Sequence, residues 1–90
     1  MDIGYDENKN LSNQIKHGIS LEESIKLWKG HHIIIPAKNI TGEKRWAILG
    51  KITEKMYICI FTIRNGSIRL ISCHRADTKL ERIFYEKTKK

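Results

Sequence analysis

The dipeptide Asn65-Gly66 constrains the fold of this chain more than any other feature, because it separates two runs of strand-forming residues. Asn-Gly favours the tight type I′ turn that joins antiparallel strands, since both central positions of that turn need a positive φ. The run before it, Met56–Arg64, is apolar on both faces, as in a strand that is covered on both sides. The run after it, Ser67–Arg75, mixes apolar and cationic residues. The sequence therefore predicts an antiparallel β-hairpin whose second strand carries more charge than a core needs.

A tight turn also sets the register of the hairpin, because each residue before it faces a fixed partner after it. Thr62 is predicted to lie opposite Arg69, and Met56 opposite Arg75. This register places Arg64, Arg69 and Arg75 on one face of the sheet, with Arg64 and Arg69 together at the turn. Neighbouring guanidinium groups repel each other unless an anion or an acidic partner bridges them. We therefore predict that an anion or an acidic partner bridges Arg64 and Arg69; the alternative is that they splay outward into solvent.

The same register turns Ser72 and His74 to the opposite face, unless a β-bulge intervenes. A single histidine in a strand is more often a hydrogen-bonded structural residue than a catalytic one. The adjacent His31 and His32 point to opposite faces of a strand, so they do not readily chelate one metal ion. The chain also has no zinc-finger spacing and no Gly-rich phosphate loop. No metal and no cofactor is therefore predicted.

A helix near the N-terminus is predicted from Glu7 to Lys16 or His17, with Asp6 as its N-cap and Gly18 as its stop. Polar residues at i, i+4, i+7 and i+8 form one stripe along it: Lys9, Asn13, Lys16 and His17. The negative end of the helix dipole favours the protonated form of His17, which suits a general acid. The alternative is a histidine that only caps exposed carbonyl groups.

The remaining elements follow from caps, breakers and alternation. They are a helix from the capping box at Ser20–Glu23 to Gly30, a strand at His32–Ala37 that Pro36 ends or confines to an edge, a strand at Glu43–Ile52, and a final helix capped by Asp77 or Thr78. In order, these elements predict an α+β fold with two N-terminal helices, a four-stranded antiparallel sheet and a C-terminal helix. We expect one domain over residues 1–90.

The charge of the chain points to a polyanionic partner. The formal net charge is +7; residues 1–24 contain five acids and two bases, a net of −3, which leaves +10 for the rest. A small domain this basic attracts nucleic acid through steering and counterion release, although a solvated basic surface is the simpler alternative. Cys59 and Cys73 lie in apolar strands and are expected to be reduced, which suggests the cytoplasm. No signal peptide and no membrane segment is expected.

Three stretches together resemble BrnT-type toxins. They are "YDENKNLSNQIKHGISLEES" at 5–24, "GEKRWAILGK" at 42–51 and "IRLISCHRADTKLERIFYE" at 68–86. The first carries the family pattern at Tyr5, Asp6, Lys9, Asn13, Lys16, His17, Gly18, Ile19, Ser20, Glu22 and Glu23. The sequence departs from the family pattern at His74, where an arginine is common, and mildly at Leu21 and Ser24.

The resemblance implies the toxin half of a type II toxin–antitoxin pair, with a RelE-like fold and ribonuclease activity. It also implies a ribbon-helix-helix antitoxin that wraps the toxin and binds operator DNA, so that DNA is contacted only through the antitoxin. A 2:2 toxin–antitoxin complex is expected.

Cleavage of RNA needs a base, an acid and cations around the scissile phosphate. We predict a metal-independent ribonuclease that inhibits translation and growth, with Arg64 and Arg69 on the phosphate and His17 and Lys9 in proton transfer or a further phosphate contact. Substrate-binding residues are predicted to be Arg75, His74 and Lys16. Glu81 and Tyr85, four apart on the final helix, are either partners of Arg69 or Arg75 or part of the site. The alternative function is a non-catalytic basic module that docks an acidic protein or nucleic acid.

Overall fold

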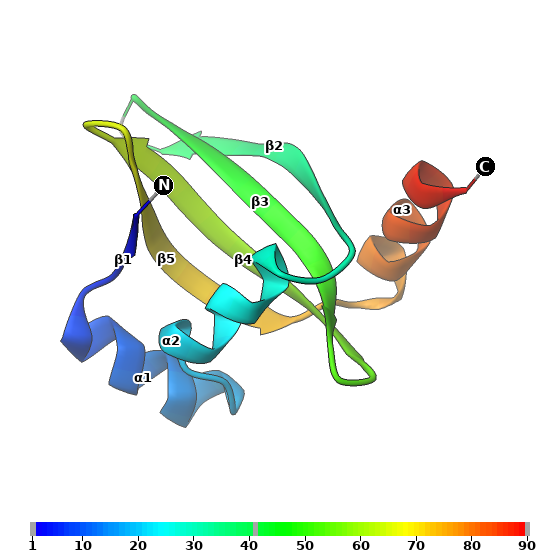
Figure 1. The fold of residues 1–90 in the computed structure, drawn as a ribbon, viewed down its shortest axis with the longest axis horizontal. Coiled ribbons are helices and arrows are strands. Elements are labelled where there is room, and N and C mark those ends of the chain that lie inside the picture. Colours follow the sequence, from blue (N-terminus) through cyan, green and yellow to red (C-terminus); the bar gives the residue numbers. More distant parts are fainter. Residues whose placement is uncertain (1, 41, 90) are drawn as a thin grey trace.

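The computed structural model describes residues 2–40 and 42–89 and confirms an α+β fold (Figure 1). Its elements are β1 (Ile3–Gly4), α1 (Glu7–His17), α2 (Leu21–Ser24), the 3-10 helix η1 (Ile25–Trp28), β2 (His32–Ile40), β3 (Glu43–Ile52), β4 (Lys55–Arg64), β5 (Ser67–Arg75) and α3 (Thr78–Thr88). The four predicted strands are all present. Two details of the prediction were wrong: the sheet has five strands rather than four, and the second helix is a single α-turn that continues as η1.

The strand order is β1-β5-β4-β3-β2, and the sheet is mixed rather than purely antiparallel. The fifth strand, β1, pairs in parallel with β5, with Ile3 beside Ile68 and Gly4 beside Arg69. The amide of Ile68 donates to the carbonyl of Asp2 over 2.8 Å. A strand of two residues is too short to show any periodicity, so no pattern in the sequence indicates it.

The predicted caps form as expected, because each supplies an acceptor to an amide that a helix leaves unpaired. The Asp6, Ser20 and Asp77 side chains accept from the amides of the residues three positions on, over 3.1, 3.0 and 2.8 Å. Gly18 ends α1 with a φ of 73°, a conformation that favours glycine.

The central hairpin begins in the predicted register. Asn65 and Gly66 both have a positive φ, and Arg64 lies opposite Ser67. Thr62 lies opposite Arg69, so Arg64 and Arg69 share a face of the sheet as predicted.

A bulge then changes the register by one residue. Phe61 pairs with Leu70, but Ile60 pairs with Ser72, so that Ile71 has no partner of its own. Because of this extra residue, the side chains of residues 72–75 lie on the opposite faces of the sheet from those predicted.

The predicted pairing of Met56 with Arg75 was therefore wrong. Tyr57 lies opposite Arg75, and Ile58 lies opposite His74. Arg75 is turned away from the face of Arg64 and Arg69, and its guanidinium carbon lies 5.9 Å from the centre of the Tyr57 ring. Ser72 and His74 instead join the face that Arg75 was expected to occupy.

The two faces of the sheet carry separate cores. The front face, which includes Cys59 and Phe61, is crossed by α2 and η1 (Figure 1). Its buried residues are Ile19, Leu21, Leu27, Ile48, Ile52, Cys59, Phe61, Ile68, Leu70 and Cys73. The back face, which includes Ile58 and Ile60, packs against α3. Its buried residues are Ala47, Leu49, Met56, Ile58, Ala76 and Phe84.

The edge strand β2 runs through Pro36 to Ile40 and is longer than predicted. Its register shifts between Ala37 and Ile40, and its position at the edge spares Pro36 a missing ladder bond. The start of this strand crosses close to Gly50, where a Cβ atom would lie 2.9 Å from the carbonyl oxygen of His31. Only glycine allows that approach.

Candidate active site

Helix α1 is attached to the sheet through polar side chains, not apolar ones. Its two large apolar residues point outward, with Leu11 52% and Ile15 85% exposed, while Asn10 and Asn13 are buried. Asn13 Nδ2 donates to the carbonyls of Cys73 and Ile19, both at 2.7 Å, and Asn13 Oδ1 accepts from the Cys73 amide at 3.1 Å. The Asn13 amide thus satisfies the free edge of β5 as a neighbouring strand would, and it holds α1 alongside that edge.

The consequence is a pocket between α1 and β5, which we call the edge pocket. It has a volume of about 300 Å³. Its lining residues are Lys9, Ser12, Asn13, Lys16, His17, Ile71 and Ser72. All four members of the predicted helix stripe therefore line a single pocket, with the bulge of β5 as its opposite wall.

The bulge also places His74 beside His17, which lines this pocket. His17 is the last residue of α1, and His74 lies on β5 two residues beyond Ser72. Their ring centroids are 5.7 Å apart, and the rings are tilted by 46°. Without the extra residue at Ile71, the alternation of β5 would turn His74 to the front face.

The hydrogen bond of His74 fixes its tautomer. Its Nδ1 lies 2.9 Å from the carbonyl oxygen of Arg75, and a carbonyl oxygen can only accept. Nδ1 therefore carries the proton in this hydrogen bond. In the neutral ring, Nε2 is then the basic nitrogen.

Cationic side chains lie in the edge pocket and further along β5. Lys9 and Lys16 line the edge pocket from α1. Arg69 lies on the same face of β5 as Ser72 and His74, since these three face Thr62, Ile60 and Ile58 of β4. Arg69 makes no ion pair with any residue in the described ranges 2–40 and 42–89. Its guanidinium is thus available to an anion from outside the chain.

Arg64 is arranged differently. Its Nε donates to Glu43 Oε2 at 2.9 Å and its Nη2 donates to Glu43 Oε1 at 3.2 Å, a fork that occupies both carboxylate oxygens. These hydrogen bonds hold the pKa of Glu43 below its usual range. Arg64 and Arg69 do line one cavity of about 280 Å³ beside β1. However, Nε and Nη2 of Arg64 already donate to Glu43.

Of the predicted site residues, the structure brings together Lys9, Lys16, His17 and His74, with Arg69 further along the same strand. Arg75 lies on the front face and Arg64 lies at the turn with Glu43. Tyr85 contacts Lys51 instead of Arg69 or Arg75, its predicted partners. Its ring centre lies 5.4 Å from Lys51 Nζ, and its hydrogen bond with Lys51 raises the pKa of that lysine.

The sequence did not indicate that Ser12 and Ser72 line the pocket, or that Asn13 anchors the helix. Ser72 was predicted to lie on the opposite face of the sheet, because nothing about Ile71 indicates the bulge that changes the register. For Asn13, the polar stripe was visible but its role in edge pairing was not. In residues 2–40 and 42–89, no three His, Cys, Asp or Glu side chains gather as a metal site requires. The helices of these residues are also too short and polar to cross a membrane.

Comparison with known proteins identifies the family of this chain. A family model described as "Ribonuclease toxin, BrnT, of type II toxin-antitoxin system" matches residues 5–79, from the residue before the α1 cap to the start of α3. A comparison with curated proteins gives no match. The family match covers α1, the bulged strand and the edge pocket between them, and so the chain belongs to the BrnT family of ribonuclease toxins of type II toxin–antitoxin systems.

Proposed function

We propose that the chain cleaves RNA at the edge pocket and thereby inhibits translation and growth. The observation that carries the proposal is the pair of histidines, His17 and His74, whose ring centroids lie 5.7 Å apart beside a cationic pocket. Two imidazoles beside one bound phosphate can supply both proton transfers of RNA cleavage.

In this proposal, His74 is the base. Its Nδ1 proton is engaged by the Arg75 carbonyl, which leaves the Nε2 lone pair to take the proton of a ribose 2′-hydroxyl. The 2′-oxygen then attacks the adjacent phosphorus atom. His17 is the acid, because its ring lies at the end of α1 in the lining of the edge pocket, where it can protonate the leaving 5′-oxygen. The products are a 2′,3′-cyclic phosphate and a 5′-hydroxyl.

The cations bind the phosphate in this scheme. Arg69 supplies a planar fork of donors, and Lys9 and Lys16 add charge from the helix side. Loss of one good contact of this type costs about 3–4 kcal/mol of transition-state stabilisation. Arg64, which the sequence suggested as a second phosphate ligand, is assigned instead to the ion pair with Glu43 that braces the turn.

Family membership supports an antitoxin partner for this chain. The antitoxin is proposed to be a ribbon-helix-helix protein that wraps the toxin in a 2:2 complex and contacts operator DNA itself. Because its substrate is cellular RNA and its inhibitor is made beside it, the toxin is placed in the cytoplasm.

The test is cleavage of a defined single-stranded RNA by the purified chain after removal of the antitoxin. We expect cleavage in the presence of EDTA, since acid, base and cations are all side chains, and products that end in a 5′-hydroxyl. Products with a 5′-phosphate, or activity that EDTA abolishes, would contradict the mechanism. RNA binding without cleavage would favour the alternative of a non-catalytic basic module.

A further inference from the structure

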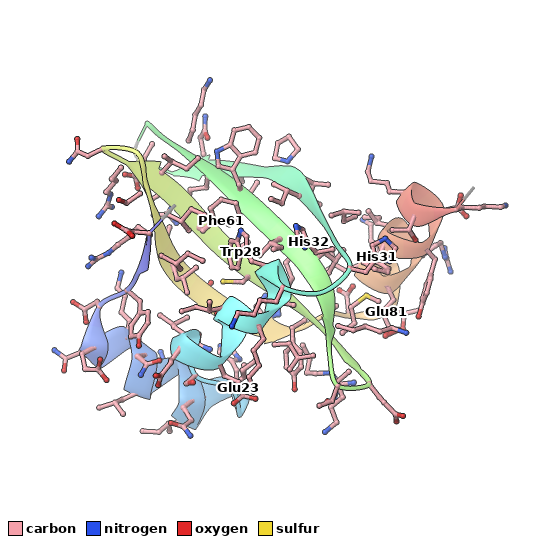
Figure 2. The ribbon with its side chains drawn as sticks, viewed as in Figure 1. Glu23, Trp28, His31, His32, Phe61 and Glu81 are labelled. Carbon is pink, nitrogen blue, oxygen red and sulfur yellow. The ribbon has the colours of Figure 1, made fainter. Side chains whose placement is uncertain are left out.

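The front face carries an apolar groove at the turn end of the sheet, remote from the edge pocket. It has a volume of about 460 Å³. It is lined by Trp28, Ile34, Trp46, Phe61, Ile63 and Ile68, and we call it the front groove. Figure 2 shows Trp28 and Phe61 together near the middle of the sheet, where η1 ends and the strands run on uncovered.

The front groove is preformed but unfilled. The Trp28 ring meets the Phe61 ring edge-on with centroids 5.2 Å apart, an arrangement that fixes one wall. Ile34 and Ile63 are 46% and 49% exposed, although Ile48, opposite Ile34, and Phe61, two residues before Ile63, are buried on the same face. An exposed apolar concavity of this kind, rimmed by polar residues, is typical of a protein-binding site.

The rim of the groove is cationic. Lys26 and Lys29 flank Trp28 and are exposed. On β3, the exposed Lys44 shares the front face with Trp46. Beyond Trp46, a second cavity of about 340 Å³ includes Lys44 and Arg45 in its lining.

The apolar groove and the lysines beside it match one kind of partner. Lys44 and Trp46 share the front face, and Trp46 lines both the groove and the cavity that includes Lys44. An exposed lysine at the margin of an apolar groove can bind a carboxylate at the end of an apolar contact. The groove therefore matches a segment with apolar side chains and flanking acidic residues.

We propose that the front groove is the docking site for an amphipathic, acidic segment of the antitoxin. The proposal depends on the antitoxin that family membership implies, and not on the cleavage chemistry. Apolar side chains of the segment fill the space between Trp28, Trp46 and Ile63, and its carboxylates meet Lys44. RNA fits less well, because the groove offers few polar atoms to a base edge and opens on the opposite face from His74.

Two substitutions on the groove test the apolar contact. We expect Ile34→Asp and Ile63→Asp each to weaken binding of the purified antitoxin, encoded beside the toxin gene, by at least a hundredfold in isothermal titration calorimetry. Both side chains are half exposed, so folding should persist, and far-UV circular dichroism and a thermal melt check it. Ile34→Thr keeps a β-branched shape suited to a strand and should give a smaller loss in the same direction.

A charge reversal tests the basic rim. Lys44→Glu should weaken antitoxin binding by about tenfold or more, and the loss should shrink in high salt because the contact is exposed. The matched control for Ile34→Asp and Ile63→Asp is Ile15→Asp, which adds the same single negative charge to an exposed apolar residue of α1. Its antitoxin affinity should remain within about threefold of the wild type.

Each outcome decides the proposal. Unchanged affinity in the well-folded Ile34→Asp and Ile63→Asp variants overturns it, as does a large loss in Ile15→Asp alone, which would place the antitoxin on α1. Loss of RNA cleavage with full antitoxin binding would make the groove an RNA platform and also overturn it. A wild-type chain that binds antitoxin but does not cleave RNA contradicts only the proposed function.

Discussion

The two halves of the β4–β5 hairpin, separated by the unpaired Ile71, are built from the same kinds of residue but do different things. Between the turn and the bulge, Arg64 and Arg69 share a face in the register that Asn65-Gly66 sets. The guanidinium group of Arg64 nevertheless donates two hydrogen bonds to Glu43 of the same chain. Beyond the bulge, each residue of β5 lies on the opposite face from the one that the turn register predicts. His74 therefore lies beside His17. The comparison teaches that a turn sets register only as far as the first irregularity, and that the irregularity here builds the site.

The largest effect should come from the far half of the hairpin and its helix. We expect His17→Ala to lower the single-turnover rate of RNA cleavage by about 10²–10⁴-fold, the usual contribution of a general acid. The matched control is His31→Ala. His31 lies near α3 (Figure 2), with its ring 5.6 Å from that of Phe84. If both variants lost activity equally, the edge pocket would not be the site.

Substitutions of the two arginines near the turn should differ in their effect on the cleavage rate. We expect Arg69→Ala to slow cleavage by about 10²–10³-fold, because it removes a phosphate donor. Arg64→Ala should slow it by less than about tenfold, because that guanidinium binds Glu43. Cleavage rates measured under identical conditions decide between them, and a larger loss in Arg64→Ala would reverse their assigned roles.

The attachment of α1 to the bulged strand can be tested by stability alone. Asn13→Ala removes buried hydrogen bonds to Cys73 and Ile19 and leaves a strand edge unpaired. We expect it to lower the free energy of unfolding by about 2–3 kcal/mol in urea titration. Asn8→Ala, at an exposed position of the same helix, is the control and should change it by less than about 0.5 kcal/mol.

The smallest effect concerns the ion pair at the turn. The pKa of Glu43 is lowered in the folded chain by its hydrogen bonds with Arg64, so the stabilisation is present above the ordinary glutamate pKa of about 4.3. It is lost as the pH falls through the lower folded-state pKa. The melting temperature of Glu43→Gln should therefore lie slightly below the wild type at neutral pH and converge with it in acid. A constant gap at every pH would mean that the ionised pair does not contribute.

Much of the fold was predictable from local signals. The caps at Asp6, Ser20 and Asp77 and the turn at Asn65-Gly66 each depend on a few adjacent residues, and each forms as expected. The strand β1 was not predictable, because its pairing comes from the tertiary position of a two-residue segment. The early end of the second α-helix also left no recognisable sign in the sequence.

The site was predictable in its components but not in its assembly. The stripe of Lys9, Lys16 and His17 was visible in the helix period, whereas its partner across the pocket depended on the bulge at Ile71. Ile71 is a β-branched residue that fits any strand position, so nothing in its side chain marks the irregularity. The ion pair of Arg64 likewise required knowledge that β3 brings Glu43 beside the turn.

The most direct test of the central claim is a double-mutant cycle between His17 and His74 in single-turnover RNA cleavage. If the bulge makes them an acid and a base acting on one phosphate, either alanine substitution should remove most of the activity. The cleavage rate of the double variant should then be less than about tenfold below that of the slower single variant. Losses that multiply in the double variant, or a His74→Ala variant that cleaves at the wild-type rate, would contradict the account.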